Sequence, residues 1–499
     1  MSRAVLIGAR AVLLAGPTAL AFFTGGYFDE PRVWAGLVVW LLVALAAFVH
    51  GRSLPRARSA WLALAGLAAL AAWTLASMAW APIAGNAYHS GEIAVLYLGA
   101  LLAAAMLLRG RWQLAVEPAL AAGTLIVVGY GLSGRLLPGL LHFSRSVSAR
   151  GRLEQPLTYW NAMGELAALG FVLCARLAGD RDRDPRLRAA AAAASAPLGL
   201  GLYLSFSRGA LFACAAGIVA LIVLAPRREQ LEALIVTIAA GALSAAAAAP
   251  FGGVTSLTGA LSTREWQGAV MLVVLLVIMA VAFSAQWVLQ RRPSDRGRLR
   301  LPRATPWLAT ALICAGLGGA IVVGAKEGSA ATVGTGASRL TTLQSNRYAY
   351  WRVAFRAFRQ EPVRGVGAGG WSVWWLRYRP FSESAADAHS LPIQTLAELG
   401  VVGLALLVTF AGGVALAAAR AMRARPGLAA GPVAALVVYL VHSPLDWDWQ
   451  MPAVSLVAFV LAGLVLALAE GVRPDAAIEA PPVTGVKRPP ILVGSGEET

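Results

Sequence analysis

Residues 268–289 read GAVMLVVLLVIMAVAFSAQWVL, an apolar run without one charged side chain. About 20 such residues are enough for one helix to cross the ~30 Å hydrocarbon core of a bilayer. Runs of this kind recur along the 499-residue chain, in which 58% of residues are hydrophobic and 13% are charged. A soluble protein carries roughly a quarter charged residues. The sequence therefore predicts an all-α fold, a polytopic transmembrane helical bundle.

The same length criterion predicts about 12–14 spans along the chain. We place them at residues 5–24, 33–50, 60–80, 92–108, 114–134, 161–178, 189–205, 209–225, 231–249, 268–289, 306–325, 396–419, 428–445 and 452–470. They divide the chain into an N-terminal transmembrane bundle (1–325), an extracytoplasmic loop (326–395), C-terminal transmembrane helices (396–471) and a tail (472–499). The tail is polar and rich in Pro, and we expect it to be disordered and cytoplasmic.

The arginines predict how the bundle is oriented. With the N-terminus inside, most loop arginines fall on the cytoplasmic side, whereas alternate loops such as 81–91 are almost free of them. This asymmetry is the positive-inside rule, and it predicts a multi-pass protein of the inner or plasma membrane with both termini cytoplasmic. It also explains the net charge of +17 without nucleic acid. The outer arginines are exceptions: Arg145, Arg150, Arg152, Arg208 and those from Arg339 to Arg379.

A polar segment from about residue 338 to 403 interrupts the apolar runs and is where we seek chemistry. Its stretch NRYAYWRVAFRAFR predicts an amphipathic helix at the bilayer surface, with Trp351, Phe355 and Phe358 on one face. We expect the arginines between them to meet lipid phosphates. Asn346 and Arg347 begin this helix, where its N-terminus and a guanidinium suit an anion. The glycines of VRGVGAGGW (363–371) fit either a phosphate loop or a simple turn.

His389 is the candidate general base, because imidazole accepts a proton near neutral pH. It lies in DAHS, just before a predicted helix that carries Gln394 and Glu398, which are placed to orient a substrate or the ring. Arg208 is flanked by apolar spans, and an ionisable side chain there is a functional candidate. The three cysteines, Cys174, Cys214 and Cys314, lie in predicted spans without metal-ligand spacing, and we expect them only to pack.

These motifs resemble those of the O-antigen ligase and Wzy-type polymerase superfamily of bacterial membrane glycosyltransferases. The resemblance is carried by SRGA at 207–210, by N-R-x-x-x-W and P-x-x-G-x-G within 346–367, by H-S-x-x-x-Q-x-x-x-E-x-G at 389–400, and by LDWDWQMP at 445–452. The family usually has Asn after the histidine, where this chain has Ser390. The segment 150–162 matches only partly and adds Arg150, Arg152 and Asn161.

The resemblance implies transfer of a glycan from a polyprenyl (undecaprenyl) diphosphate donor to an acceptor hydroxyl on the extracytoplasmic face, without metal, cofactor or nucleotide sugar. It assigns catalytic roles to His389, Arg347 and Arg208. The substrate-binding residues would be Arg150, Arg152, Asn161, Asn346, Gln394, Glu398 and Asp446. The partners would be the lipid-linked donor, a glycan, lipid or protein acceptor, and membrane lipids.

Three alternatives stay open on the sequence. A polysaccharide polymerase needs the same donor site as a ligase, so the residues do not separate the two. A lipid-linked glycan transporter or flippase would favour charges near the bilayer midplane and a repeat between halves, neither of which the sequence favours. A non-enzymatic membrane scaffold explains the hydrophobicity but gives no reason for Arg208, Arg347 and His389 to share one side.

Overall fold

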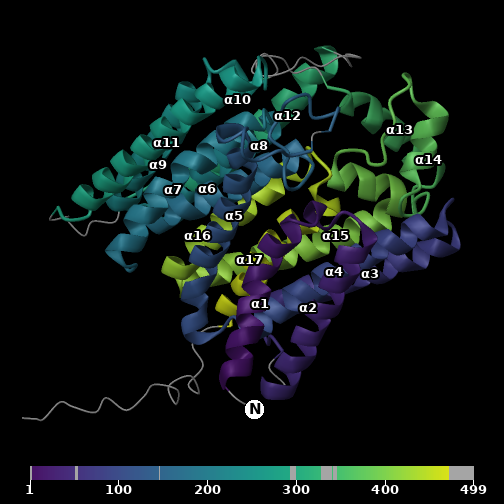
Figure 1. Cartoon of the computed structure of the whole chain (residues 1–499). Helices are drawn as coiled ribbons and strands as arrows, with labels where there is room; N and C mark the ends of the chain where they lie inside the picture. Colours follow the sequence, from purple (N-terminus) through teal and green to yellow (C-terminus); the bar gives the residue numbers. More distant parts are fainter. Residues whose placement is uncertain are drawn as a thin grey trace, which may run out of the picture.

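The computed structural model describes residues 3–50, 54–144, 146–292, 299–327, 340 and 345–470. In this part of the chain the fold is all-α, with no strand, as the sequence predicts (Figure 1). The tail 472–499 and the outer arginines Arg145 and Arg339 lie outside the described residues. The expected division of the chain into domains stays a prediction.

The helices follow the predicted spans closely. They are α1 (Arg3–Ala21), α2 (Asp29–His50), α3 (Arg58–Ala76), α4 (Ala84–Leu107), α5 (Gln113–Leu136), α6 (Trp160–Gly179), α7 (Pro185–Leu204), α8 (Arg208–Leu224), α9 (Arg228–Ala248), α10 (Gly252–Thr255), α11 (Leu261–Leu289), α12 (Thr305–Glu327), α13 (Arg347–Gln360), α14 (Trp371–Tyr378), α15 (Leu391–Ala424), α16 (Pro426–His442) and α17 (Pro452–Leu468). Among the described residues, 11 helices are long and apolar enough to cross a membrane, and α8, α16 and α17 are shorter apolar helices.

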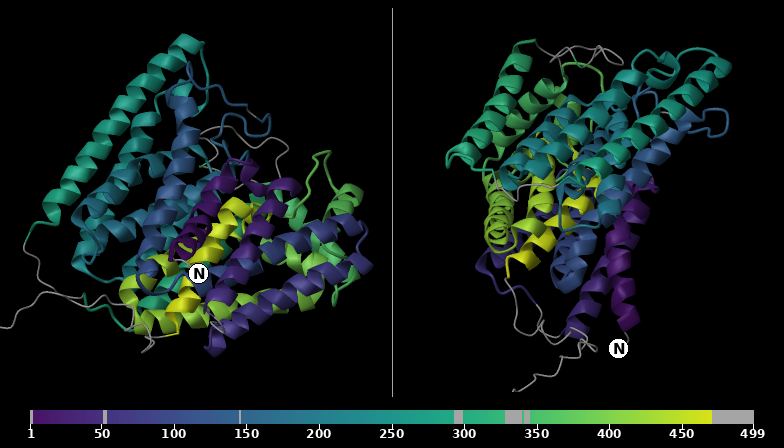
Figure 2. Two further views of the ribbon diagram at one scale, coloured as in Figure 1. Left: turned by 60° about the horizontal axis from the view of Figure 1, so that its bottom comes forward. Right: turned by 90° about the vertical axis from the view of Figure 1, so that its left-hand side faces the viewer.

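Two helices form the centre of the bundle. Every residue of α17 is buried, and α6 is buried along its whole apolar window. Helix α17 packs against α4, α16, α1 and α15, while α6 packs against α7, α5, α8 and α16. Helices α7, α9 and α11 lie side by side at one flank, and α13 and α14 lie at the opposite flank (Figures 1 and 2).

The loop between α12 and α15 has a small aromatic core of its own. Tyr350 and Trp351 from α13 pack with Trp371 and Trp375 from α14, and all four are buried. In α13, Trp351 is buried in this core, whereas Phe355 is 43% exposed. The position of α13 at the bilayer surface stays a prediction. Tyr350 packs edge-on against Trp371 and Trp375. Three arginines of α13, Arg352, Arg356 and Arg359, are exposed.

Helix α15 breaks at Gly400, inside the span predicted at 396–419. Gly400 has φ 68° and ψ −166°, a conformation that is open essentially to glycine alone. The segment 362–367 fills the break: Val401 N–H donates to the Pro362 carbonyl (2.9 Å) and Gly367 N–H donates to the Glu398 carbonyl (2.8 Å). The break therefore fastens the loop to the membrane helix.

We expect Gly400→Ala to lower the unfolding midpoint in detergent. An added Cβ would lie 2.1 Å from the Val363 carbonyl oxygen, and the strained backbone alone costs about 1–3 kcal/mol. Gly412→Ala, further along the same helix, is the matched control because nothing lies within 4 Å of its Cβ position. Its midpoint should stay or rise, since Ala favours a helix over Gly. Equal losses in both variants would contradict this account.

Candidate active site

A buried ion pair joins the loop between α12 and α15 to the bundle. The Arg347 guanidinium, on the first residue of α13, donates to Asp446 Oδ2 at 2.6 Å, and the Asp446 side chain has no exposed surface. Asp446 lies in the turn between α16 and α17. Its other oxygen accepts from the Tyr159 hydroxyl at 2.6 Å, and Asn161 donates to that hydroxyl at 2.8 Å. The structure thus brings the predicted residues Arg347, Asp446 and Asn161 together.

The electrostatics of the pair follow from this geometry. Burial alone would raise the pKa of Asp446, but the positive charge of Arg347 holds it below its usual value. Burial likewise opposes the charged form of Arg347, yet Asp446 and Tyr159 raise its pKa. Both groups are therefore ionised, and the pair carries no net charge into the protein interior.

His389 occupies a left-handed backbone conformation, with φ 54°. Its Nδ1 lies 2.9 Å from the Asp387 carbonyl oxygen. Because a carbonyl oxygen only accepts, Nδ1 carries the proton of the neutral ring, and Nε2 is the basic nitrogen. The ring lies between two aromatic side chains, 5.1 Å from the Tyr350 ring centre and 6.1 Å from that of Trp447. Trp447 directly follows Asp446, so His389 and the ion pair belong to one site.

Gln394 holds the His389 loop in shape. Its amide nitrogen donates to Asp387 Oδ1 at 2.9 Å, and its amide oxygen accepts from Ala388 N–H at 3.1 Å. Both polar ends of the amide are therefore engaged with the two residues that precede His389. The sequence suggested that Gln394 orients a substrate or the ring, and the contacts favour orientation of the ring through its backbone.

The Glu398 side chain, on the same helix as Gln394, is buried and hydrogen-bonded within the protein. The carboxylate is only 5% exposed and accepts from Trp371 N–H at 3.2 Å. The glycine-rich segment beside it donates its N–H groups internally: Val366 to the Ala397 carbonyl, and Ala368 to the Ser77 hydroxyl. Of the two readings that the sequence left open, these contacts favour a packed turn over a phosphate loop.

The side chains of Asn346 and its neighbour Arg347 contact different partners. Its amide nitrogen donates to Glu383 Oε2 at 2.5 Å, whereas Arg347 turns to Asp446. The two side chains therefore bind different carboxylates, and an anion site at the start of α13 stays a prediction. The helix N-terminus also has no side-chain cap from Asn346.

Arg152 approaches the ion pair from the segment before α6. Its guanidinium stacks 3.6 Å from the centre of the Trp160 ring and donates to the carbonyls of Ala149 and Ser148. Burial lowers the pKa of Arg152 to about 10, and the charges of Arg150 and Arg347 act in the same direction. Arg152 is thus within electrostatic range of Arg347, and positive charge gathers here.

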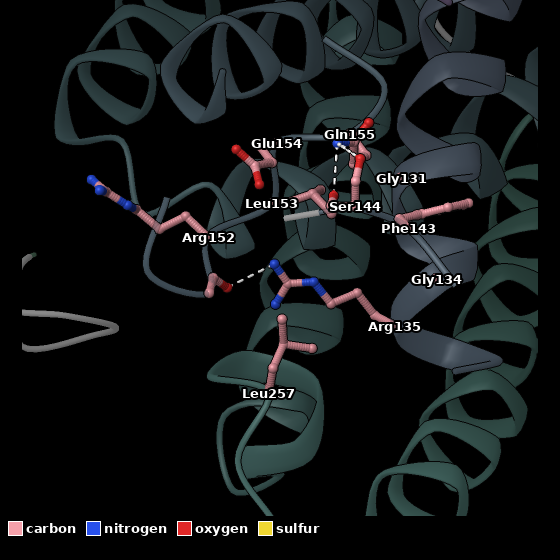
Figure 3. Close-up of a pocket in the computed structure, with 11 residues that line it drawn as sticks. Gly131, Gly134, Arg135, Phe143, Ser144, Arg152, Leu153, Glu154, Gln155 and Leu257 are labelled. Carbon is pink, nitrogen blue, oxygen red and sulfur yellow. Dashed lines mark hydrogen bonds between the residues drawn. The ribbon is translucent and has the colours of Figure 1, made fainter. Parts of the chain in front are cut away.

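Figure 3 shows the pocket next to this segment. Arg135 donates to the Gly151 carbonyl at 2.7 Å, whereas the Arg152 guanidinium points away from it. Glu154 accepts from Ser146 N–H at 2.7 Å. This pocket has a volume of about 40 Å³ and is lined in part by the loop that carries Arg152.

Arg208 begins α8, where the Ser207 hydroxyl caps the helix by accepting from Ala210 N–H at 3.3 Å. The next residue, Gly209, packs against His442 and Leu445. Arg208 therefore lies beside the segment that leads to Asp446, at the same end of the bundle as the ion pair.

Several residues of this site escaped the sequence analysis. His442 Nδ1 lies 2.5 Å from Asp448 Oδ2 and 3.3 Å from Glu165 Oε2, and none of the three side chains is exposed. Their ligand atoms lie close enough together to hold a metal ion, and the ring nitrogen is hydrogen-bonded to Asp448. Tyr159 and Trp447 were missed as well. The repeated D-W of LDWDWQ was the available signal for Trp447 and Asp448.

The comparisons with known proteins agree with the resemblance seen in the sequence. A family model described as O-antigen ligase matches residues 193–408, which include Arg208, Arg347 and His389. No curated protein matches the chain significantly. The match confirms the resemblance to O-antigen ligases over this segment. Together with the apolar helices it indicates a multi-pass membrane enzyme of polysaccharide biosynthesis, of the ligase or polymerase type.

We expect Asp446→Asn to destabilise the protein by about 3 kcal/mol, because it leaves Arg347 buried without its counter-charge. The double variant Arg347→Gln/Asp446→Asn should lose less stability than the sum of the two single variants. A double-mutant cycle built from unfolding midpoints measures this difference. Because the pKa of Asp446 in the folded protein lies below its ordinary value of 3.8, the stability that Asp446 contributes is fully present above pH 3.8. That stability is lost only when the pH falls through the lower folded pKa. The cost should thus be constant between about pH 5 and 8. Additive effects would contradict the pairing.

Proposed function

We propose that this protein is a membrane glycosyltransferase that moves a glycan from a polyprenyl diphosphate donor to an acceptor hydroxyl on the extracytoplasmic face. In this proposal His389 is the general base, and Arg347, with Arg152 and Arg208, stabilises the diphosphate. The observation that carries the proposal is the convergence of His389, the Arg347–Asp446 pair and Arg152 around Tyr159 and Trp447.

The reaction is a single displacement. The acceptor oxygen forms a bond to the anomeric carbon while the bond from that carbon to the diphosphate oxygen breaks, so the configuration inverts. His389 Nε2 takes the acceptor proton, since Nδ1 is already committed to the Asp387 carbonyl. The departing diphosphate gains negative charge, and guanidinium groups stabilise it without a metal ion.

Arg347 is suited to this task despite its bond to Asp446. A guanidinium has five N–H donors, and Asp446 accepts from one nitrogen of it. The Arg347 side chain is 20% exposed while that of Asp446 is not exposed at all. Asp446 therefore orients Arg347 from behind and leaves the outer edge of the guanidinium for a phosphate.

The aromatic lining suits a sugar substrate. The Trp447 ring centre lies 4.6 Å from that of Tyr159, 5.5 Å from that of Tyr27 and 6.1 Å from that of His389. Flat apolar rings with polar edges bind one face of a pyranose while leaving its hydroxyls to polar groups. The acceptor decides between a ligase and a polymerase, because both reactions use this donor site.

We expect His389→Ala to abolish the acceptor-dependent release of free polyprenyl diphosphate from a glycan-loaded carrier in proteoliposomes, by roughly 100-fold or more. His142→Ala is the matched control, since His142 is exposed on a neighbouring outer loop. Release should need both an acceptor and His389. Intact carrier in the wild type, with labelled lipid moving between leaflets, would indicate a flippase and refute the proposal.

We expect Arg347→Lys to lose most of the same activity although the charge is kept. The lysine ammonium is a point charge that does not bridge Asp446 and a phosphate as a planar fork does. The fall should appear in kcat, because the developing charge of the leaving group is what the fork stabilises. Arg352→Lys, at an exposed position on the same helix, should leave activity unchanged. Wild-type turnover in Arg347→Lys would rule out direct diphosphate binding.

A further inference from the structure

A second basic site lies far from the candidate active site, at the ends of α6, α7, α9 and α11. It is a pocket of about 80 Å³ whose polar lining comes from Arg181, Arg188, Arg228, Arg292, Glu229, Glu232, Gln286 and Gln290. Four arginines face two glutamates, so the lining carries two net positive charges. By the positive-inside rule this end of the helices is the cytoplasmic one.

Within the pocket the carboxylates neutralise only part of the positive charge. Arg181 bonds Glu229 at 3.0 Å, and Arg228 bonds Glu232 at 2.9 Å. Arg188 is 6% exposed and donates through Nε to the Ala178 carbonyl. The charges of Asp180 and Glu229 act on this guanidinium, but four arginines against two glutamates leave the lining an excess of positive charge that an anion would balance.

Gln286 supplies a second observation that indicates a ligand. The side chain is 2% exposed, and its amide nitrogen donates to the Ala178 carbonyl at 2.9 Å. Its amide oxygen has no hydrogen-bond partner among the described residues, and neither has that of Gln290. Buried acceptors without partners are costly. A ligand that fits here therefore combines negative charge with hydroxyl donors.

The surroundings favour a lipid over a free anion. The side of α11 that leads away from the pocket exposes apolar residues, among them Val281 and Val288. Acyl chains fit along such a face while the headgroup enters the pocket at the helix ends. Basic pockets between transmembrane helices at the cytoplasmic side are a recognised setting for anionic headgroups.

We propose that this pocket binds the headgroup of an anionic phospholipid, with the arginines on its phosphate and the glutamine oxygens on its hydroxyl groups. Phosphatidylglycerol has this chemistry. The bound lipid joins α7, α9 and α11 at their cytoplasmic ends, at a distance from the glycan chemistry. The site is therefore independent of the proposed enzymatic function.

The test is native mass spectrometry and thermal unfolding of the purified full chain in detergent, with phosphatidylglycerol or phosphatidylcholine added. Wild type should retain phosphatidylglycerol and gain stability from it, but not from phosphatidylcholine. The variant Arg228→Gln/Arg292→Gln removes the net charge of the lining at two exposed positions, so it should fold. Its affinity should fall roughly five-fold for each arginine, about 25-fold in all.

The matched control is Arg111→Gln/Arg423→Gln, which removes two exposed arginines, one just before α5 and one in the last turn of α15, on the same predicted side. It should bind phosphatidylglycerol like wild type. An equal loss in the control, or none in the Arg228/Arg292 variant, would overturn the proposal. Inorganic phosphate at the same concentration should not stabilise the protein; equal stabilisation by phosphate alone would show an ion site and refute lipid binding.

Discussion

The structure depends on the rule that a charge taken into a bilayer-embedded protein must be compensated. Arg347 comes from the loop between α12 and α15 and Asp446 from the turn between α16 and α17, 99 residues apart, and each is the counter-charge of the other. Removing either would leave a buried charge, which is far costlier than the gain from an exposed pair. The ion pair therefore fixes the loop on the bundle at the point where the candidate chemistry takes place.

A second constraint acts on the backbone at the opposite end of the same loop. At the break, peptide groups near Gly400 lack the hydrogen bonds that a continuous membrane helix would provide. Backbone hydrogen bonds with the segment 362–367 take their place. Gly365 approaches so closely that an added Cβ would lie 2.2 Å from the Glu398 carbonyl carbon. Glycine is needed at both positions, because packing this tight leaves no room for a side chain.

How much the sequence predicts depends on the range of the interaction. Local hydropathy predicts the spans. His389 and Arg347 are candidate site residues on the sequence because polar residues stand out in an apolar chain. The partners were harder to find, since Tyr159 meets Asp446 across 287 residues. The sequence predicts that Gln394 orients a substrate or the ring. Its contacts with Asp387 and Ala388, however, depend on a loop conformation that residue types do not specify.

Backbone strain distinguishes His389 from the other described histidine side chains. A non-glycine residue at positive φ costs on the order of 1–3 kcal/mol and persists only where its surroundings hold it. Here Trp351 Nε1 donates to the Ala388 carbonyl at 3.1 Å, and Leu391 N–H donates to the Ser443 carbonyl at 2.9 Å. His442, by contrast, has no exposed surface, and its Nδ1 is hydrogen-bonded to Asp448. A ring whose Nδ1 is fixed and whose backbone is held in a costly conformation presents Nε2 in one direction, which is what a general base requires.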